Sequence, residues 1–199
     1  PVSRYFDRIT RPPQLLASLP AALRVLTDPV QCGPATIALP QDVQAEVFDW
    51  PEHFFAPRLH RFRAPEPDVA ELAAAARALR TAKRPLVIAG GGVKYGLACE
   101  ALSAFALRRG LPVAETQAGK GSLAWDDSAN VGSIGVTGSS AANALAAKAD
   151  LVLAVGTRLA DFTTGSRALF PQAQIIGLNA APFDAAKQGA LPLVADAGR

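Results

Sequence analysis

Three loops of this 199-residue sequence combine glycine with residues that bind anions. Residues 90–92 are Gly-Gly-Gly, residues 115–121 are Glu-Thr-Gln-Ala-Gly-Lys-Gly, and residues 156–158 are Gly-Thr-Arg. Glycine lets a backbone approach a diphosphate, and a helix that begins there offers oriented N–H groups. An arginine just past a strand can hold a phosphate or flavin oxygen with its planar fork. The three loops together predict contact with a nucleotide.

Each loop also has a purely structural interpretation. The triple glycine can be a tight turn, the second loop a solvated segment, and Arg158 can pair with Asp161. A dinucleotide-binding protein remains an alternative, because Glu115 follows the glycine turn at about the 20-residue distance of a ribose-binding acid. Against it, Tyr95 stands where the fingerprint G-x-G-x-x-G needs glycine.

Other groups that could do chemistry are sparse. His53 and His60 lie in a proline-rich stretch and are expected to be exposed rather than to bind metal. Cys32 and Cys99 lack zinc-ligand spacing, so we expect two reduced, buried thiols in a cytoplasmic protein. Ser139 is expected to cap a helix rather than to act as a nucleophile. No catalytic residue and no metal ligand is assigned.

Alternating helices and apolar strands must position the loops. Helices are predicted over residues 68–81, with Asp68 as cap, 97–109, stopped by Gly110, and 139–149. Strands are predicted over 86–89, 113–115, 151–155, 174–178 and 191–194. Unbroken apolar strands that alternate with helices indicate an α/β fold, a Rossmann-like, doubly wound parallel sheet over residues 67–199.

The first part of the chain has a different texture. Residues 14–27 show helical periodicity, which Pro20 is expected to kink or divide, and residues 35–39 predict one strand. We interpret residues 1–49 as a helix-strand remnant of another domain and residues 50–66 as a linker. The single strand is expected to pair with another copy of the chain or with the central domain.

Bulk composition narrows the function classes. Half of the residues are hydrophobic, 19% are charged and the net charge is +3, which fits a folded domain. The excess charge is too small to indicate nucleic acid, and the arginines at 58, 61 and 63 are expected to be solvated. No apolar run is long enough for a membrane helix.

The run through residues 85–92, 112–113, 149–151 and 156–158 resembles the central domain of enzymes that depend on thiamine diphosphate (ThDP), such as acetohydroxyacid synthase, pyruvate oxidase and benzaldehyde lyase. Residues 33–43 resemble the end of the pyrimidine-binding domain of that family. Further runs, at 2–9, 39–46, 115–121, 134–138 and 161–164, resemble the branch that cleaves a C–C bond of a cyclic diketone, trihydroxycyclohexanedione, in myo-inositol catabolism. Members of this branch are also described as malonic semialdehyde oxidative decarboxylases.

The resemblance implies an enzyme that uses ThDP and Mg²⁺, a small-molecule substrate and a homo-oligomer. In the family, a glutamate of the pyrimidine-binding domain activates ThDP, and a Gly-Asp-Gly motif followed by Asn holds the metal. No Gly-Asp-Gly occurs in the 199 residues. We therefore expect that the ThDP-binding domains lie elsewhere in the same polypeptide, and that this piece alone is inactive and binds no ThDP.

Some relatives bind FAD or an ADP-like nucleotide in the central domain. The resemblance carries this role to Gly90, Gly91, Gly92, Thr116, Gly156, Arg158, Asn179 and Asp196. Flavin-binding relatives often have Asp where Asn179 stands, so flavin binding is in doubt and an empty pocket is as well supported. Two other function classes stay open: a free-standing NAD- or FAD-binding protein, and a structural oligomerisation domain.

Overall fold

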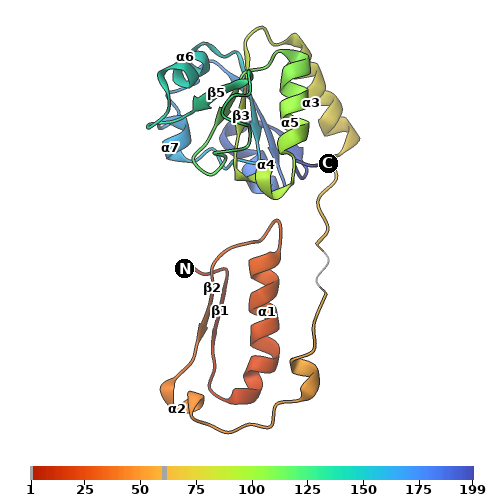
Figure 1. Ribbon diagram of the computed structural model, residues 1–199, viewed down its shortest axis with the longest axis vertical. Coiled ribbons are helices and arrows are strands. Elements are labelled where there is room, and N and C mark those ends of the chain that lie inside the picture. The colour runs from red at the N-terminus through yellow and green to blue at the C-terminus, as the bar shows by residue number, and fades with distance from the viewer. Residues whose placement is uncertain (1, 60–61) are drawn as a thin grey trace. The chain divides into compact units, whose positions relative to one another are not determined.

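The computed structural model describes residues 2–59 and 62–199, and these form two compact units, Pro1–Arg63 and Ala64–Arg199. Figure 1 shows both units and labels several of their elements. His60 and Arg61, which the sequence assigned to a linker, lie outside the described residues.

The second unit contains a six-stranded sheet in the order β5-β4-β3-β6-β7-β8, and every neighbouring pair is parallel. Its strands are β3 (Pro85–Ala89), β4 (Val113–Glu115), β5 (Asn130–Ser133), β6 (Leu151–Val155), β7 (Gln174–Asn179) and β8 (Leu191–Val194). The order reverses between β3 and β6, which makes their carboxyl ends the switch point of a doubly wound sheet. The predicted fold class is confirmed.

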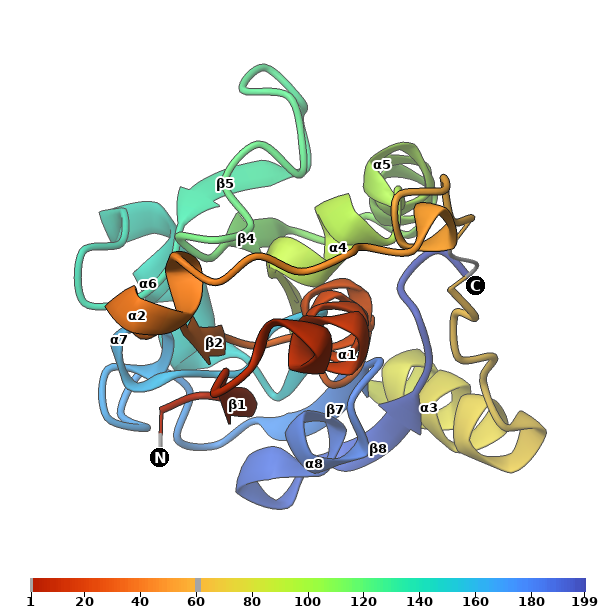
Figure 2. The ribbon, with the colours of Figure 1, turned by 90° about the horizontal axis from the view of Figure 1, so that it is seen from below.

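Helices cover both faces of this sheet (Figure 2). They are α3 (Val69–Thr81), α4 (Gly91–Tyr95), α5 (Cys99–Arg109), α6 (Ser140–Lys148), α7 (Asp161–Thr164) and α8 (Pro182–Ala185), followed by a 3-10 turn, η3 (Lys187–Gly189). Two predicted caps are confirmed: Asp68 accepts the amides of residues 70 and 71, and Ser139 accepts that of residue 142. Gly110 ends α5 in the left-handed conformation, as expected.

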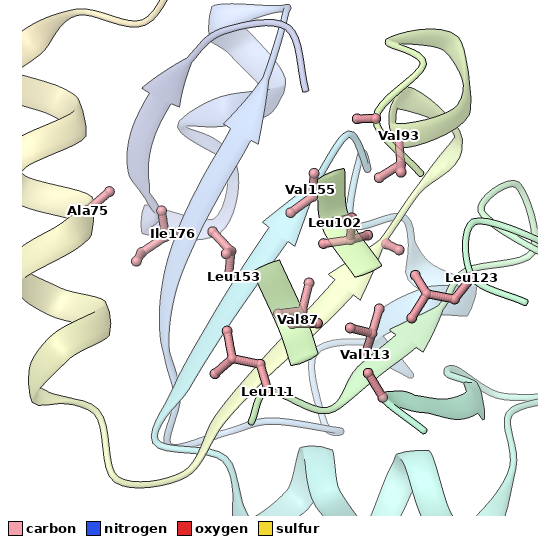
Figure 3. Close-up of a cluster of buried hydrophobic side chains, with 14 of the residues drawn as sticks. Ala75, Val87, Val93, Leu102, Leu111, Val113, Leu123, Leu153, Val155 and Ile176 are labelled. Carbon is pink, nitrogen blue, oxygen red and sulfur yellow. The ribbon is translucent and has the colours of Figure 1, made fainter. Parts of the chain in front are cut away.

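Alternation along the strands divides the core into two layers. On one face, Val87, Leu153 and Ile176 point toward Ala75 of α3 and Leu102 of α5 (Figure 3). On the other face, Leu86, Ile88 and Val152 pack with alanines of α6. Because β3 and β6 are apolar on both sides, they must lie in the middle of the sheet, covered by helices.

An aspartate fixes the amino ends of the two central strands. The two carboxylate oxygens of Asp150 accept the backbone N–H groups of Lys83 (2.8 Å) and Arg84 (2.9 Å). The Nε of Arg84 in turn donates to the carbonyl of Lys148 at 2.7 Å. The bonds from the Arg84 and Lys83 amides favour the ionised carboxylate and lower the pKa of Asp150.

The first unit is a strand-helix-strand arrangement. It contains β1 (Tyr5–Arg8), η1 (Pro12–Gln14), α1 (Leu15–Thr27), β2 (Ala35–Ala38), α2 (Gln41–Gln44) and η2 (Glu52–Phe54). Asp7 of β1 accepts hydrogen bonds from the Ser18 hydroxyl and from the Gln14 amide, and these bonds lower the pKa of Asp7. This network attaches the strand to the start of the helix.

The expectation for the strand at 35–39 was wrong. Strand β2 pairs in parallel with β1, Tyr5 opposite Ala35 and Arg8 opposite Ala38, so its partner is a strand of the same unit. Residues 5–8 alternate between inward Tyr5 and Asp7 and exposed Phe6 and Arg8, so they carry no apolar run that marks a strand.

Pro20 does not divide the helix in which it lies. The segment is continuous from Leu15 to Thr27, with Pro20 inside it.

Throughout the described part of the chain, none of the helices combines the length and the apolar character that crossing a lipid bilayer requires.

Candidate functional site at the carboxyl ends of the strands

The loops after β3 and β6 meet at the switch point through direct backbone contact. The amide of Gly90 donates to the carbonyl of Val155 at 2.8 Å, and that of Gly92 donates to Gly156 at 2.9 Å. A Cβ on Gly92 would lie 2.6 Å from the Gly156 Cα, and one on Gly90 would lie 2.3 Å from the Gly156 oxygen. Glycine is therefore required at these positions because two backbones touch.

Gly91 differs from its two neighbours. A Cβ on Gly91 would meet only the exposed Tyr95 ring at 3.3 Å and Ala118 at 3.4 Å. Gly91 is the first residue of α4, a helix of five residues. The triple glycine thus contains two residues that close backbone packing demands and one that tolerates a methyl group.

The loop after β4 is held from inside. Glu115 is 1% exposed, and its Oε1 accepts the amide of Leu123 at 3.0 Å. Thr116 is also buried, and its hydroxyl accepts the amide of Gly119 at 3.0 Å. Glu115 therefore faces the core and is not available to a ribose hydroxyl.

Arg158 is the exposed cation of the group. Its side chain is 75% exposed, and its Nε lies 3.7 Å from Asp184 Oδ2. The pairing suggested for Arg158 with Asp161 is therefore not the one observed. A pair at this distance and exposure leaves the guanidinium accessible to solvent anions.

Asn179 is the last residue of β7, and Asp196 lies two residues after the end of β8. The Asn179 amide donates to the Thr157 carbonyl at 3.1 Å, and its oxygen accepts the amide of Ala181 at 3.0 Å. Asp196 accepts the amide of Gly198 at 2.9 Å, and its carboxylate lies beside Gly96, just after α4. The fold thus brings residue 196 next to the glycine loop, a proximity that spacing along the chain does not show.

Two lysines, which the sequence did not single out, link neighbouring loops. Lys94 Nζ donates to the carbonyl of Lys120 at 3.0 Å, joining the loops after β3 and β4. Lys187 Nζ donates to the carbonyl of Arg158 at 2.9 Å, joining the loops after β6 and β7. Their targets are backbone carbonyls, which no sequence motif marks.

The predicted residues are thus gathered at one edge, but most of their polar groups bind other parts of the protein. The Asn179 side chain uses both its NH₂ group and its oxygen within the protein, and Asp196 uses Oδ1. Within residues 2–59 and 62–199, no cluster of three or more His, Cys, Asp or Glu could hold a metal ion. Of the two cysteines, Cys32 is exposed and Cys99 is partly exposed, so the expectation that both thiols are buried was wrong.

The sequence model of the family described as "Thiamine pyrophosphate enzyme, central domain" matches residues 72–199, which is more than half of the chain and most of the second unit. The chain belongs to this family. The resemblance seen in the sequence is therefore confirmed, and so is the class of the sheet.

The chain is also similar over nearly its whole length to proteins named 3D-(3,5/4)-trihydroxycyclohexane-1,2-dione hydrolase. It is 48% identical to one from Geobacillus thermodenitrificans, with 98% of this chain and 31% of the relative aligned. For relatives from Clostridium tetani and Halalkalibacterium halodurans the identities are 46% and 47%, over 98% and 100% of this chain. The chain spans about a third of the length of these relatives.

Proposed function

We propose that this chain is the central part of a ThDP-dependent enzyme that cleaves a C–C bond of trihydroxycyclohexanedione. The observation that carries the proposal is the identity of 46–48% over nearly the whole chain to hydrolases of that name. The similarity includes the first unit as well as the sheet domain. A shared domain fold alone would not support so specific a substrate.

In this proposal the second unit is a scaffold. ThDP supplies the electron sink for cleavage next to a carbonyl. The residues of this chain contribute rigidity, through the glycine contact at the switch point and the buried Glu115 that holds the loop after β4. We propose that ThDP and Mg²⁺ are held by other parts of the enzyme, because the Gly-Asp-Gly motif that the resemblance assigns to the metal does not occur in these 199 residues.

The division of labour can be tested by titration calorimetry of the 199-residue chain with ThDP and Mg²⁺. We expect no binding with a Kd below about 100 μM, because Mg²⁺ is held by protein oxygens together with the diphosphate, and the Gly-Asp-Gly motif that the family uses for this is missing from these 199 residues. Binding in the micromolar range would overturn the assignment of a scaffold role.

The substrate can be tested in the full-length polypeptide that contains this chain. With ThDP and Mg²⁺, it should open the ring of trihydroxycyclohexanedione. The loss of the diketone absorbance measures this reaction. Pyruvate and malonic semialdehyde are the comparison substrates. Turnover of either of these, without ring opening, would replace the proposed activity with that of a related decarboxylase or synthase.

The alternative of a free-standing dinucleotide-binding protein has weaker support. The strand order suits it, but Glu115 is buried and Tyr95 interrupts the fingerprint. Titration with NAD⁺ and FAD separates the two proposals, since only the alternative requires submicromolar to micromolar binding by this chain alone.

We further propose that the parent enzyme is a cytoplasmic homo-oligomer. Size-exclusion chromatography with light scattering can test its oligomeric state.

A further inference from the structure

Three consecutive carbonyl groups of the loop after β6 each accept a hydrogen bond from a side chain. The carbonyl of Thr157 accepts from Asn179 Nδ2 at 3.1 Å, and that of Arg158 accepts from Lys187 Nζ at 2.9 Å. The carbonyl of Leu159 accepts from Gln188 Nε2 at 3.0 Å. The three donors all come from one segment, residues 179–188.

An ion pair also joins the same segment to the loop. Asp184 of α8 lies 3.7 Å from the Arg158 side chain, and Lys187 of η3 donates to the Arg158 carbonyl. Two neighbouring turns of the segment therefore contact the same residue. Asn179 ends β7, which pairs directly with β6. The segment therefore starts on the sheet and crosses to the loop.

The loop is held in a conformation that its sequence does not favour. Leu159 has φ +44° and is 3% exposed, so a branched residue is held in the left-handed region with its side chain in the core. Gln188 also has positive φ, +60°. Such residues persist only when the surrounding structure determines their conformation. The three side-chain bonds are among these contacts, together with the packing of Leu159 in the core.

We propose that residues 179–188 form a strap that fixes residues 157–159, and with them the position of the exposed Arg158 side chain. Gly156 is anchored independently by Gly92, so release of the strap frees the loop from Thr157 onward and leaves the switch-point contact intact. Leu159 then leaves its strained backbone conformation. The backbone of Arg158 is no longer fixed, and its side chain samples several positions.

The amide of Leu159 reports on the strap, because it donates to Thr157 Oγ1 at 3.2 Å in a buried position. Hydrogen exchange of this amide is compared between the unaltered chain and the double variant Lys187→Ala, Gln188→Gly. Glycine at 188 keeps the positive φ without strain and removes only the side-chain donor. Lys83→Ala with Gln172→Gly, at two exposed positions, is the matched control.

We expect exchange at Leu159 to rise at least tenfold in the strap variant and less than twofold in the control. The amide of Gly156, which donates to Leu178 at 2.8 Å, should keep its protection in both. Unchanged exchange at Leu159 in a folded strap variant would overturn the proposal. If the double variant loses its fold, Lys187→Ala alone is judged by the same criterion, since its bond is exposed.

Discussion

The amide nitrogen of Gly92 lies 2.9 Å from the carbonyl oxygen of Gly156, and this bond joins the loops on either side of the switch point. In many doubly wound proteins a glycine turn here offers its N–H groups to a diphosphate. In this chain the amides of Gly90 and Gly92 are both already used by the protein. The contact also excludes a side chain at either residue.

Alanine substitutions at Gly91 and Gly92 test whether close backbone packing is what requires glycine in this turn. Gly92→Ala should lower the free energy of unfolding by about 1–3 kcal/mol, because the new Cβ would overlap the Gly156 backbone. Gly91→Ala is the matched control, and its effect should be below about 1 kcal/mol, since only an exposed tyrosine ring must yield. Urea unfolding measures both. Equal losses in the two variants would contradict the packing argument.

Gly110 tests conformation without packing. It has φ +63°, and a Cβ there would meet nothing within 4 Å. Gly110→Ala should therefore cost about 1 kcal/mol from the left-handed backbone alone, and Gly110→Asn should cost less. Thermal unfolding of the two variants checks this order. A larger loss for Asn than for Ala would show that the left-handed backbone is not the main source of the destabilisation.

Removing the Glu115 carboxylate should loosen the loop after β4. Glu115→Ala leaves the buried amide of Leu123 without its acceptor, at a cost of about 1–3 kcal/mol. Glu66→Ala, which removes an exposed ion pair of 3.4 Å with Arg199, should cost at most about 1 kcal/mol. Urea unfolding compares the two carboxylates. A similar, small effect at both sites would show that Glu115 does not hold the loop.

Asp150 should make stability depend on pH in the acid range. The Arg84 and Lys83 amides lower its pKa below 3.8, so its contribution is present above the unfolded pKa and is lost as pH falls through the folded pKa. In Asp150→Asn, one of the two oxygens that accept the Lys83 and Arg84 amides is replaced by an NH₂ group, which cannot accept a hydrogen bond.

The unfolding free energies of the unaltered chain and of Asp150→Asn should therefore differ most above the unfolded pKa of Asp150 and converge as the pH falls through its lowered folded pKa. Urea titrations at several pH values measure the difference directly. A difference that stays constant with pH would mean that the ionised carboxylate is not the stabilising form.

The sequence alone determined the fold class, because β3 and β6 are apolar on both faces and the helices between strands carry readable caps. It also marked the residues that meet at the switch point, since glycine and arginine directly follow those strands. It missed β5 and β1, because residues 130–133 and 5–8 have no apolar run. An edge strand is specified mainly by hydrogen bonds between its backbone and that of the neighbouring strand. Amino-acid composition gives little indication of these bonds.

Only the tertiary structure decided what the marked residues do. The amide of Gly92 is used by Gly156, Glu115 points into the core, and Arg158 is held by Asp184 and Lys187, which no motif singled out. These outcomes depend on hydrogen bonds to backbone atoms of segments far away in the chain. Every residue except proline has the same backbone N–H and C=O groups, so their choice of partner appears only when the strands are assembled.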